Sequence, residues 1–240
     1  MAYDGTDFHG WQRQPGLRTV QGVLESCLGA ALGEPVRLTG AGRTDAGCHA
    51  RGQVASFTTR VRVPGHAIAP MLRRHLPLDL EVKGSRETET GFDARRSARA
   101  RRYAYRLLDH PDVLLARLAW CPPRRAEADA LQRAVRSLEG SHDCAAFAAS
   151  GCSATRTECV VHRIAWRRWE GGLVLDIVAD HFLYHMVRNV VGTAVAIAGA
   201  RDPGRAMTEI VAAGQRSKAG ATAPPQGLSL EEVFYPAEAA

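Results

Sequence analysis

The pattern of apolar and polar positions divides the chain into short helices and strands. Apolar residues recur at helical spacing over 20–31, with Thr19 as a candidate N-cap and Gly33 directly behind, which is typical of an amphipathic helix. The same pattern predicts further helices over 67–75, 126–138, 184–200 and 205–213. Period-two or continuous apolar runs predict strands over 36–38, 53–57, 80–82, 103–107, 164–169, 173–179 and 228–234.

Turn-forming residues separate these elements. Glu170 and two glycines join the runs 164–169 and 173–179, which we expect to pair as a hairpin. Residues 40–47 are too rich in glycine for a helix or a central strand, and 214–226 form a polar Gly/Ala/Pro loop. The order of elements is similar in two halves, 1–98 and 99–240, which indicates an α+β fold of two pseudo-duplicated subdomains.

The first residues resemble the tail of a strand that enters a loop. Because the rest of that strand is not in the sequence, we expect the biological start to lie several residues upstream. Upstream sequence that alternates apolar and polar residues would agree with this expectation, and sequence rich in polar residues, Gly and Pro would contradict it.

Composition narrows the classes of protein only partly. The net charge of +6 and the pI near 9.3 favour polyanionic partners. The basic residues are almost all Arg, a bias that a GC-rich genome also produces, so charge alone leaves a nucleic-acid partner open. With no signal peptide and no apolar run long enough to span a bilayer, we expect a cytoplasmic protein without a membrane partner.

The cysteines do not indicate a metal site. The six are scattered, and none forms a CxxC pair or a zinc-finger array. The triplet Cys144, Cys152 and Cys159, with His142 and His162 nearby, is the nearest approach to a ligand set. We favour small buried thiols in a reducing compartment.

The segment most suggestive of chemistry is 42–49, which contains Asp45. Small residues flank this carboxylate and allow another backbone or a flat base to come close. Arg43 is near enough to bind a phosphate or to influence the acid. The residues alone leave two interpretations: a substrate-binding loop with an exposed acid, or a tight turn with a capping Asp.

A family resemblance favours the first interpretation. The stretch AGRTDAGCHA at 41–50 resembles the signature of the bacterial tRNA pseudouridine synthase A family, in which the Asp is essential. Four more segments resemble family motifs in family order: YDGTDFHGWQRQ at 3–14, RRYAY at 101–105, FLYHMVRN at 182–189 and GLSL at 227–230. The resemblance implies a continuous, mostly antiparallel central sheet flanked by helices, with the active site in a cleft between the halves.

Two departures from the family pattern stand out. Cys48 occupies a position where the family usually has a branched apolar residue, a substitution of similar volume that we expect to be tolerated. The family's first strand, which belongs to the central sheet, is largely missing from the sequence.

The resemblance also implies the roles of single residues. Asp45 would be the catalytic nucleophile, Arg188 would pair with it and keep it ionised, and Tyr103 would lie against the target base. Leu228 would form the apolar floor of the pocket. Isomerising uridine to pseudouridine involves no net redox change, so no cofactor is required.

The substrate implied is tRNA, at positions 38, 39 and 40 of the anticodon arm, held by a homodimer. Arg13, Arg43 and His49 are candidate substrate contacts. Other candidate contacts to RNA phosphates are Arg51, Arg95, Arg96, Arg99 and Arg102.

Two other functions compete with this one. A non-catalytic RNA-binding protein would need the basic surface but not Asp45, Tyr103 and Arg188 together. A glycosidic-bond hydrolase with an Asp nucleophile usually needs a second carboxylate, and none accompanies Asp45 in its motif.

Overall fold

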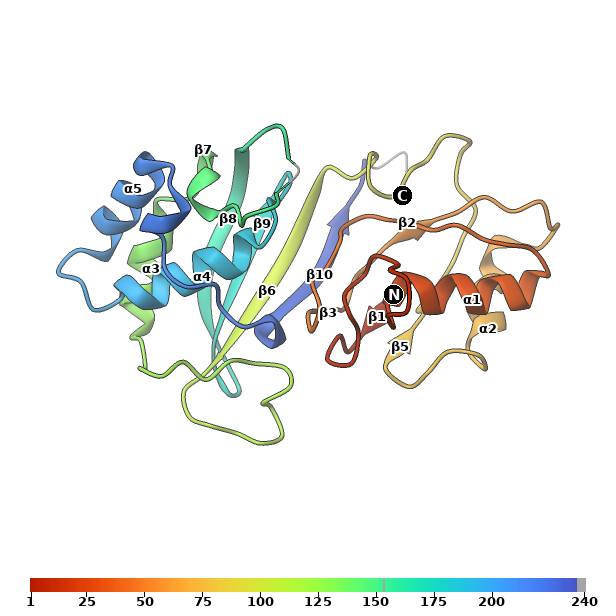
Figure 1. The fold of residues 1–240 in the computed structure, drawn as a ribbon, viewed down its shortest axis with the longest axis horizontal. Coiled ribbons are helices and arrows are strands. Elements are labelled where there is room, and N and C mark those ends of the chain that lie inside the picture. The colour runs from red at the N-terminus through yellow and green to blue at the C-terminus, as the bar shows by residue number, and fades with distance from the viewer. Residues whose placement is uncertain (153, 237–240) are drawn as a thin grey trace. The chain divides into compact units, whose positions relative to one another are not determined.

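Residues 1–152 and 154–236 are described by a computed structural model, in which the chain divides into two units (Figure 1). One unit comprises Met1–Arg99 together with the segment that starts at Leu230, and the other comprises Ala100–Ser229. Each contains antiparallel strands and helices, so the predicted α+β class is confirmed.

The strands of the first unit are very short. They are β1 (Ala2–Tyr3), β2 (Thr39–Gly40), β3 (His49–Ala50), β4 (Ala55–Ser56) and β5 (Leu80–Glu81). In the main sheet of this unit the order is β5-β1-β3-β10, where β10 is Leu228–Phe234, while β2 and β4 pair separately. Tyr3 pairs antiparallel with Ala50 on one side and Leu80 on the other. The predicted strand tail is therefore an inner strand.

The helices of this unit are α1 (Val20–Leu32) and α2 (Ile68–Leu72), which pack together. At the start of α1 the Thr19 side chain accepts a hydrogen bond from the Gly22 amide, and Gly33 ends the helix in the left-handed conformation, as predicted. The helix predicted over 67–75 is shorter. It follows a 3₁₀ turn, η1 (Gly65–Ala67). After the helix, the amides of Arg73 and His75 bond to the carbonyls of Pro70 and Leu72, three residues earlier, as in a 3₁₀ turn.

The strand predicted over 36–38 is wrong, because the extended segment begins at Thr39. Side chains of α1 bind the Leu38 backbone instead of a neighbouring strand. The Glu25 carboxylate accepts a hydrogen bond from the Leu38 amide, and the Gln21 amide donates one to the Leu38 carbonyl. Such side-chain bonds replace a ladder and cannot be read from a hydrophobic pattern.

The second unit contains a regular antiparallel sheet of order β6-β9-β8-β7. Tyr103 lies opposite Ile177, and β8 and β9 form the predicted hairpin. The strands are β6 (Ala100–Leu108), β7 (Gly140–Asp143), β8 (Glu158–Trp169) and β9 (Gly172–Ala179).

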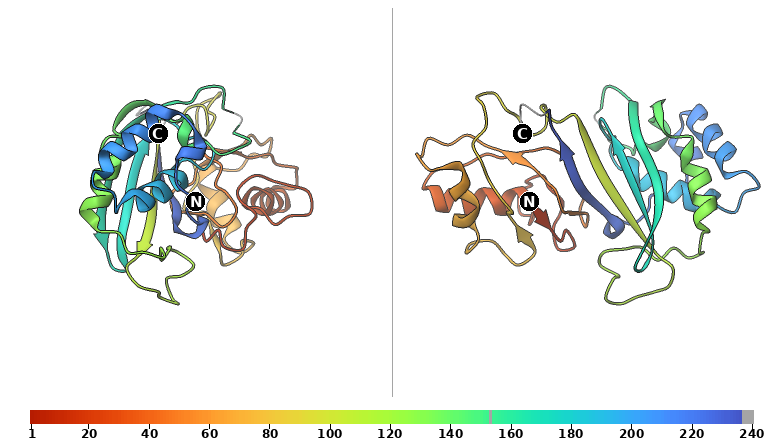
Figure 2. Two further views of the ribbon diagram at one scale, coloured as in Figure 1. Left: turned by 60° about the vertical axis from the view of Figure 1, so that its left-hand side comes forward. Right: turned by 180° about the vertical axis from the view of Figure 1, so that it is seen from behind.

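Two helices cover one face of this sheet, with α3 against β8 and α4 against β6, and a third, α5, packs against these two helices (Figure 2). They are α3 (Ala128–Arg136), α4 (Met186–Ile197) and α5 (Pro203–Ala213). Short 3₁₀ turns complete this unit: η2 (Ala145–Phe147), η3 (Arg216–Lys218) and η4 (Pro225–Gly227).

The last strand, β10 (Leu228–Phe234), has the predicted bounds. The amides of Arg51 and Gly52 both donate to the Leu230 carbonyl, at 2.8 and 3.1 Å. These bonds place the chain from Leu230 onward with the first unit, whereas the sequence-based division kept it with residues 99–229.

Candidate active site

The predicted catalytic loop lies in the first unit. Residues 41–48 form no helix or strand, and the Cys48 amide donates to the Asp45 carbonyl at 3.1 Å, which closes a turn. Gly47, inside this turn, has a positive φ of 77°, a conformation that favours glycine. Asp45 itself is partly exposed, whereas Thr44 before it is buried.

A buried cluster of polar side chains, Tyr3, Thr44 and Gln53, fixes the backbone of this loop. The Tyr3 hydroxyl lies 2.8 Å from Thr44 Oγ1 and accepts a bond of 3.3 Å from the Gln53 side-chain amide. The same amide donates to the Gly42 carbonyl at 2.7 Å. Burial raises the pKa of the Tyr3 phenol, so the hydroxyl keeps its proton. Tyr3 and Gln53 thus hold the backbone on the N-terminal side of Asp45.

The opening loop, residues 4–18, lies against the same segment. The Trp11 amide donates to the Thr44 carbonyl at 3.0 Å. A Cβ added to Gly10 would lie 2.8 Å from that carbonyl oxygen, and one added to Gly5 would lie 1.8 Å from the Cys48 oxygen. These two contacts explain why the first family motif is rich in glycine.

Three predicted substrate contacts of this unit lie in different environments. Arg43 is exposed, and its side chain has no hydrogen bond or ion pair with residues of the described ranges. The Arg13 side chain is exposed and contacts Glu25 at 3.2 Å. His49 is buried, and its Nδ1 accepts a bond of 3.0 Å from the Gly5 amide. The imidazole therefore supports the opening loop.

The remaining predicted residues lie in the second unit. Tyr103 is buried on β6, and its ring meets Phe182 edge-on, with ring centroids 4.9 Å apart. Leu228 is also buried and follows Gly227, which lies so close to Tyr105 that a Cβ would approach the ring to 2.5 Å. Tyr105 is fully buried and donates to the Pro224 carbonyl at 2.7 Å, a structural role.

Arg188 lies in the first turn of α4. Its Nε donates to the Ala223 carbonyl at 2.8 Å, and the Ala223 amide donates to the Arg188 carbonyl at 3.1 Å. This pair of bonds fixes one edge of the guanidinium. Just before the helix, His185 has φ 61° and is the only non-glycine with positive φ among residues 1–152 and 154–236. Such backbone outliers concentrate at functional sites.

The predicted residues are therefore divided between the two units. Asp45, Arg43, Arg13 and His49 belong to the first unit, and Tyr103, Arg188 and Leu228 belong to the second. Sequence reasoning missed the partners that hold these residues in place, namely Tyr3, Gln53, Phe182 and Ala223. For Tyr3, Phe182 and Ala223 only their position in or near a motif was a signal, and Gln53 had none.

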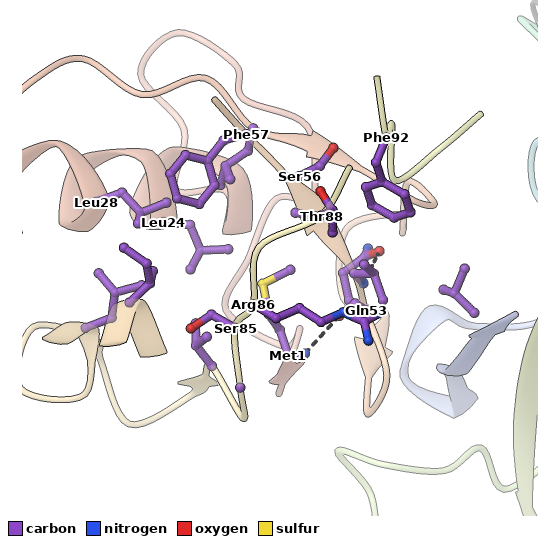
Figure 3. A pocket seen from close by; sticks show the side chains of 18 of the residues that line it. Met1, Leu24, Leu28, Gln53, Ser56, Phe57, Ser85, Arg86, Thr88 and Phe92 are labelled. Atoms are coloured by element: carbon purple, nitrogen blue, oxygen red, sulfur yellow. Dashed lines mark hydrogen bonds between the residues drawn. The ribbon is translucent and has the colours of Figure 1, made fainter. Parts of the chain in front are cut away.

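One cavity has none of the predicted site residues in its lining. It has a volume of about 680 Å³ and lies in the first unit, between apolar side chains of α1, α2 and the segment 82–92 (Figure 3). Leu24, Leu28, Phe57 and Phe92 line it, and Arg86 supplies a cation. It has no carboxylate in its lining, so it lacks the acid that the proposed chemistry needs.

Over residues 1–152 and 154–236, no three His, Cys, Asp or Glu side chains are grouped so as to hold a metal ion. No disulfide joins the six cysteines, all of which lie in the described ranges; Cys48, Cys144 and Cys159 are buried and the other three are partly exposed. Within the described ranges no helix is long and apolar enough to cross a membrane.

Comparison with known proteins extends over nearly the whole chain. A family model described as tRNA pseudouridine synthase matches residues 1–95 and 134–236. The tRNA pseudouridine synthase A of Acetivibrio thermocellus is 37% identical over 237 residues, covering 98% of this chain and 97% of that protein.

Two further relatives carry the same name. That of Moorella thermoacetica is 40% identical over 239 residues, covering 98% of this chain and 97% of its own. That of Coxiella burnetii is 39% identical over 240 residues, covering 98% and 91%. Matches of this identity and coverage show that the chain belongs to the tRNA pseudouridine synthase A family and is an RNA pseudouridine synthase, an isomerase that converts uridine to pseudouridine in tRNA.

Proposed function

We propose that this synthase modifies uridines 38, 39 and 40 in the anticodon stem-loop of tRNA, with Asp45 as the catalytic nucleophile. The observation that carries the proposal is the setting of Asp45. The carboxylate is partly exposed, while Gly42 and Thr44, on the N-terminal side of Asp45, are bound to a buried cluster. Holding a reactive group in one geometry is a large part of what an active site contributes.

The reaction requires three changes at one nucleotide. The C1′–N1 bond breaks, the uracil turns, and a new bond forms between C1′ and C5. The proton on C5 is lost and N1 gains one, so atoms and electrons balance without an oxidant. A carboxylate nucleophile divides this exchange into two easier steps through a covalent intermediate.

Asp45 acts only when it is ionised, and burial under a bound base opposes ionisation. We propose that Arg188 offsets this cost by pairing with the carboxylate. Its Nε is occupied by the Ala223 carbonyl, so its terminal nitrogens would make the pair. Tyr103 would offer the base a ring face and assist removal of the C5 proton, and Leu228 would form the apolar floor of the pocket.

A uridine inside a stem has to leave the helix before it can react. Unstacking costs roughly a few kcal/mol, which contacts to RNA phosphates must offset. We propose Arg13 and Arg43 for these contacts, since both side chains are exposed. His49 is proposed as a lesser contact because it is buried. Further candidates are Arg51, Arg95, Arg96, Arg99 and Arg102.

We also propose that the enzyme acts as a homodimer in the cytoplasm. The family resemblance implies a tRNA held across two subunits, and the net charge of +6 per chain suits a polyanionic substrate.

Tritium release from tRNA labelled at uridine C5 tests the reaction. We expect tritium to appear in water while the base stays attached to the ribose. A hydrolase would free uracil, and a non-catalytic binding protein would release neither.

Three tRNAs, each with cytidine replacing uridine at one of positions 38, 39 and 40, test which uridines are modified. Unchanged release from a tRNA lacking all three uridines would contradict the anticodon assignment.

A further inference from the structure

A polar network in the second unit joins α4 to the segment 214–224. Asn189, which directly follows Arg188 in the first turn of α4, is fully buried. Its side-chain amide donates to the Phe147 carbonyl at 2.7 Å. Its Oδ1 accepts bonds from Thr222 Oγ1 at 2.6 Å and from Arg216 Nη2 at 3.0 Å. Because Nδ2 donates to a carbonyl and Oδ1 accepts from two donors, only one of the two flipped orientations of the amide satisfies these bonds.

The Arg216 guanidinium donates its hydrogen bonds to uncharged groups. Nη2 donates to Asn189 and to Thr222 Oγ1, and Nη1 donates to the carbonyls of Gly220 at 2.9 Å and Ala219 at 3.4 Å. In the part of the chain that the structure describes, Arg216 forms no ion pair with a carboxylate. The planar guanidinium therefore serves to order the loop backbone.

The same loop lies against the α4 backbone without intervening side chains. A Cβ on Gly192 would be 1.8 Å from the Ala221 oxygen, and one on Gly220 would be 2.8 Å from the Gly192 oxygen. Thr193 Oγ1 accepts a bond of 3.0 Å from the Gly220 amide. The loop consequently has little room to slide along the helix.

The network ends at the residue that holds Arg188. Ala223 follows Thr222 directly, is buried, and exchanges two hydrogen bonds with Arg188, one of them to the guanidinium Nε. We propose that Thr222, Asn189 and Arg216 are positioning residues that orient the Arg188 guanidinium through Ala223. This inference rests on the proposed role of Arg188.

Thr222→Val tests the inference, because it removes the hydroxyl and keeps the volume. We expect kcat for tritium release to fall by about tenfold or more, since small misplacements of a reacting geometry are costly. KM should change much less. Thr222→Ser, which keeps the hydroxyl, should restore turnover. Thr208→Val is the matched control, because exposed Thr208 donates to the Gly204 carbonyl on α5, away from this network.

A double-mutant cycle with Arg188→Lys separates positioning from general loss of structure. Lysine keeps the positive charge, but its single side-chain nitrogen cannot donate to the Ala223 carbonyl and also supply two further nitrogens for the proposed pair with Asp45. If Thr222 acts through Arg188, adding Thr222→Val to Arg188→Lys should cause no further loss of kcat. Equal losses in both backgrounds would overturn the inference.

A spectroscopic measurement tests it without turnover. The Arg188 Nε–H resonance, identified by its absence in Arg188→Lys, should shift in Thr222→Val and stay in place in Thr208→Val. An unchanged resonance in Thr222→Val would overturn the inference while leaving the proposed function standing. Wild-type turnover in Arg188→Lys and in Arg188→Ala would instead refute the proposed role of Arg188, and this inference with it.

Discussion

At the residue scale, the site depends on side chains that fix other side chains. Asp45 is carried by a turn whose flanking residues bond to Tyr3 and Gln53, and Arg188 is bound by Ala223. None of these supports has an unusual chemistry of its own. They matter because a carboxylate or guanidinium free to rotate would lose most of its catalytic advantage.

Asp45→Asn should abolish turnover and leave tRNA bound. Asparagine has nearly the same shape but is not a comparable nucleophile, so we expect kcat to fall by at least about 10³-fold. Loss of a negative charge near phosphates should leave tRNA affinity unchanged or tighter. Tritium release and filter binding measure the two effects. Asp129→Asn, at an exposed acid in the first turn of α3, is the control, and turnover retained in Asp45→Asn would remove Asp45 from the mechanism.

Tyr3→Phe should reduce both stability and turnover. Without the hydroxyl, buried Thr44 and Gln53 lose a partner, which costs roughly 1–3 kcal/mol of unfolding free energy. The Asp45 loop should loosen, and kcat should fall by about tenfold. Tyr235→Phe also removes a phenol hydrogen bond, to the Ala94 carbonyl, and should affect stability alone. Equal turnover in the two variants would refute the role of Tyr3 in holding the loop.

At the element scale, α4 carries both Arg188, the proposed partner of Asp45, and a glycine that lets a loop lie against the helix backbone. Arg188 projects from its first turn, and Gly192, one turn later, allows the segment 219–223 to touch the helix. Glycine ordinarily weakens a helix interior by roughly 0.5–1 kcal/mol relative to alanine. Here close contact between loop and helix compensates for that weakness.

Gly192→Ala should therefore destabilise the protein although alanine is the better helix former. The added methyl group would overlap the Ala221 oxygen, at a cost of about 1–3 kcal/mol that exceeds the gain in propensity. The displaced loop should also lower kcat through Ala223. Chemical denaturation and tritium release measure both. A Cβ on Gly199 meets nothing within 4 Å, so Gly199→Ala is the control, and equal stability of the two variants would contradict the prediction.

At the scale of the whole molecule, charge governs the encounter with tRNA. The chain carries a net charge of +6, and exposed Arg43 lies two residues from the proposed nucleophile. Each Arg or Lys that neutralises a phosphate releases counterions and makes binding more sensitive to salt.

Arg43→Ala should weaken tRNA binding and reduce its salt dependence. The slope of log K against log salt concentration should become smaller in magnitude by about one. Arg205→Ala is the control, because Arg205 is exposed on α5 and pairs with Glu209. Binding titrations over a series of salt concentrations measure the slopes. An unchanged slope in Arg43→Ala would show that Arg43 does not contact a phosphate.

The proposed homodimer is tested by mass in solution. Light scattering should give about twice the 26.0 kDa of one chain. A mass equal to one chain at the concentrations used for turnover, with full activity, would contradict the dimer. Addition of tRNA should then raise the mass in a proportion that reports how many tRNAs each dimer holds.

The sequence by itself determined the family, the longer helices and the candidate chemistry. Local signals were sufficient for α1, where Thr19 and Gly33 mark the ends, for the hairpin β8–β9, and for β10. Motifs of several residues also led to the proposed roles of Asp45 and Arg188, because a motif records chemistry directly. Short elements such as β3 and α2 were missed or misjudged, since two to five residues carry too little periodicity.

Only the tertiary structure decided which residues support the site. The Gln53 side chain forms hydrogen bonds with Gly42, 11 residues away in the sequence, and with Tyr3, 50 residues away. Thr222 bonds to Asn189, 33 residues away. It also decided that Leu38 is bound by α1 and that β10 lies beside β3 in the sheet. Hydrogen bonds between distant segments depend on how the chain is folded in space, and that arrangement leaves no periodic trace along the sequence.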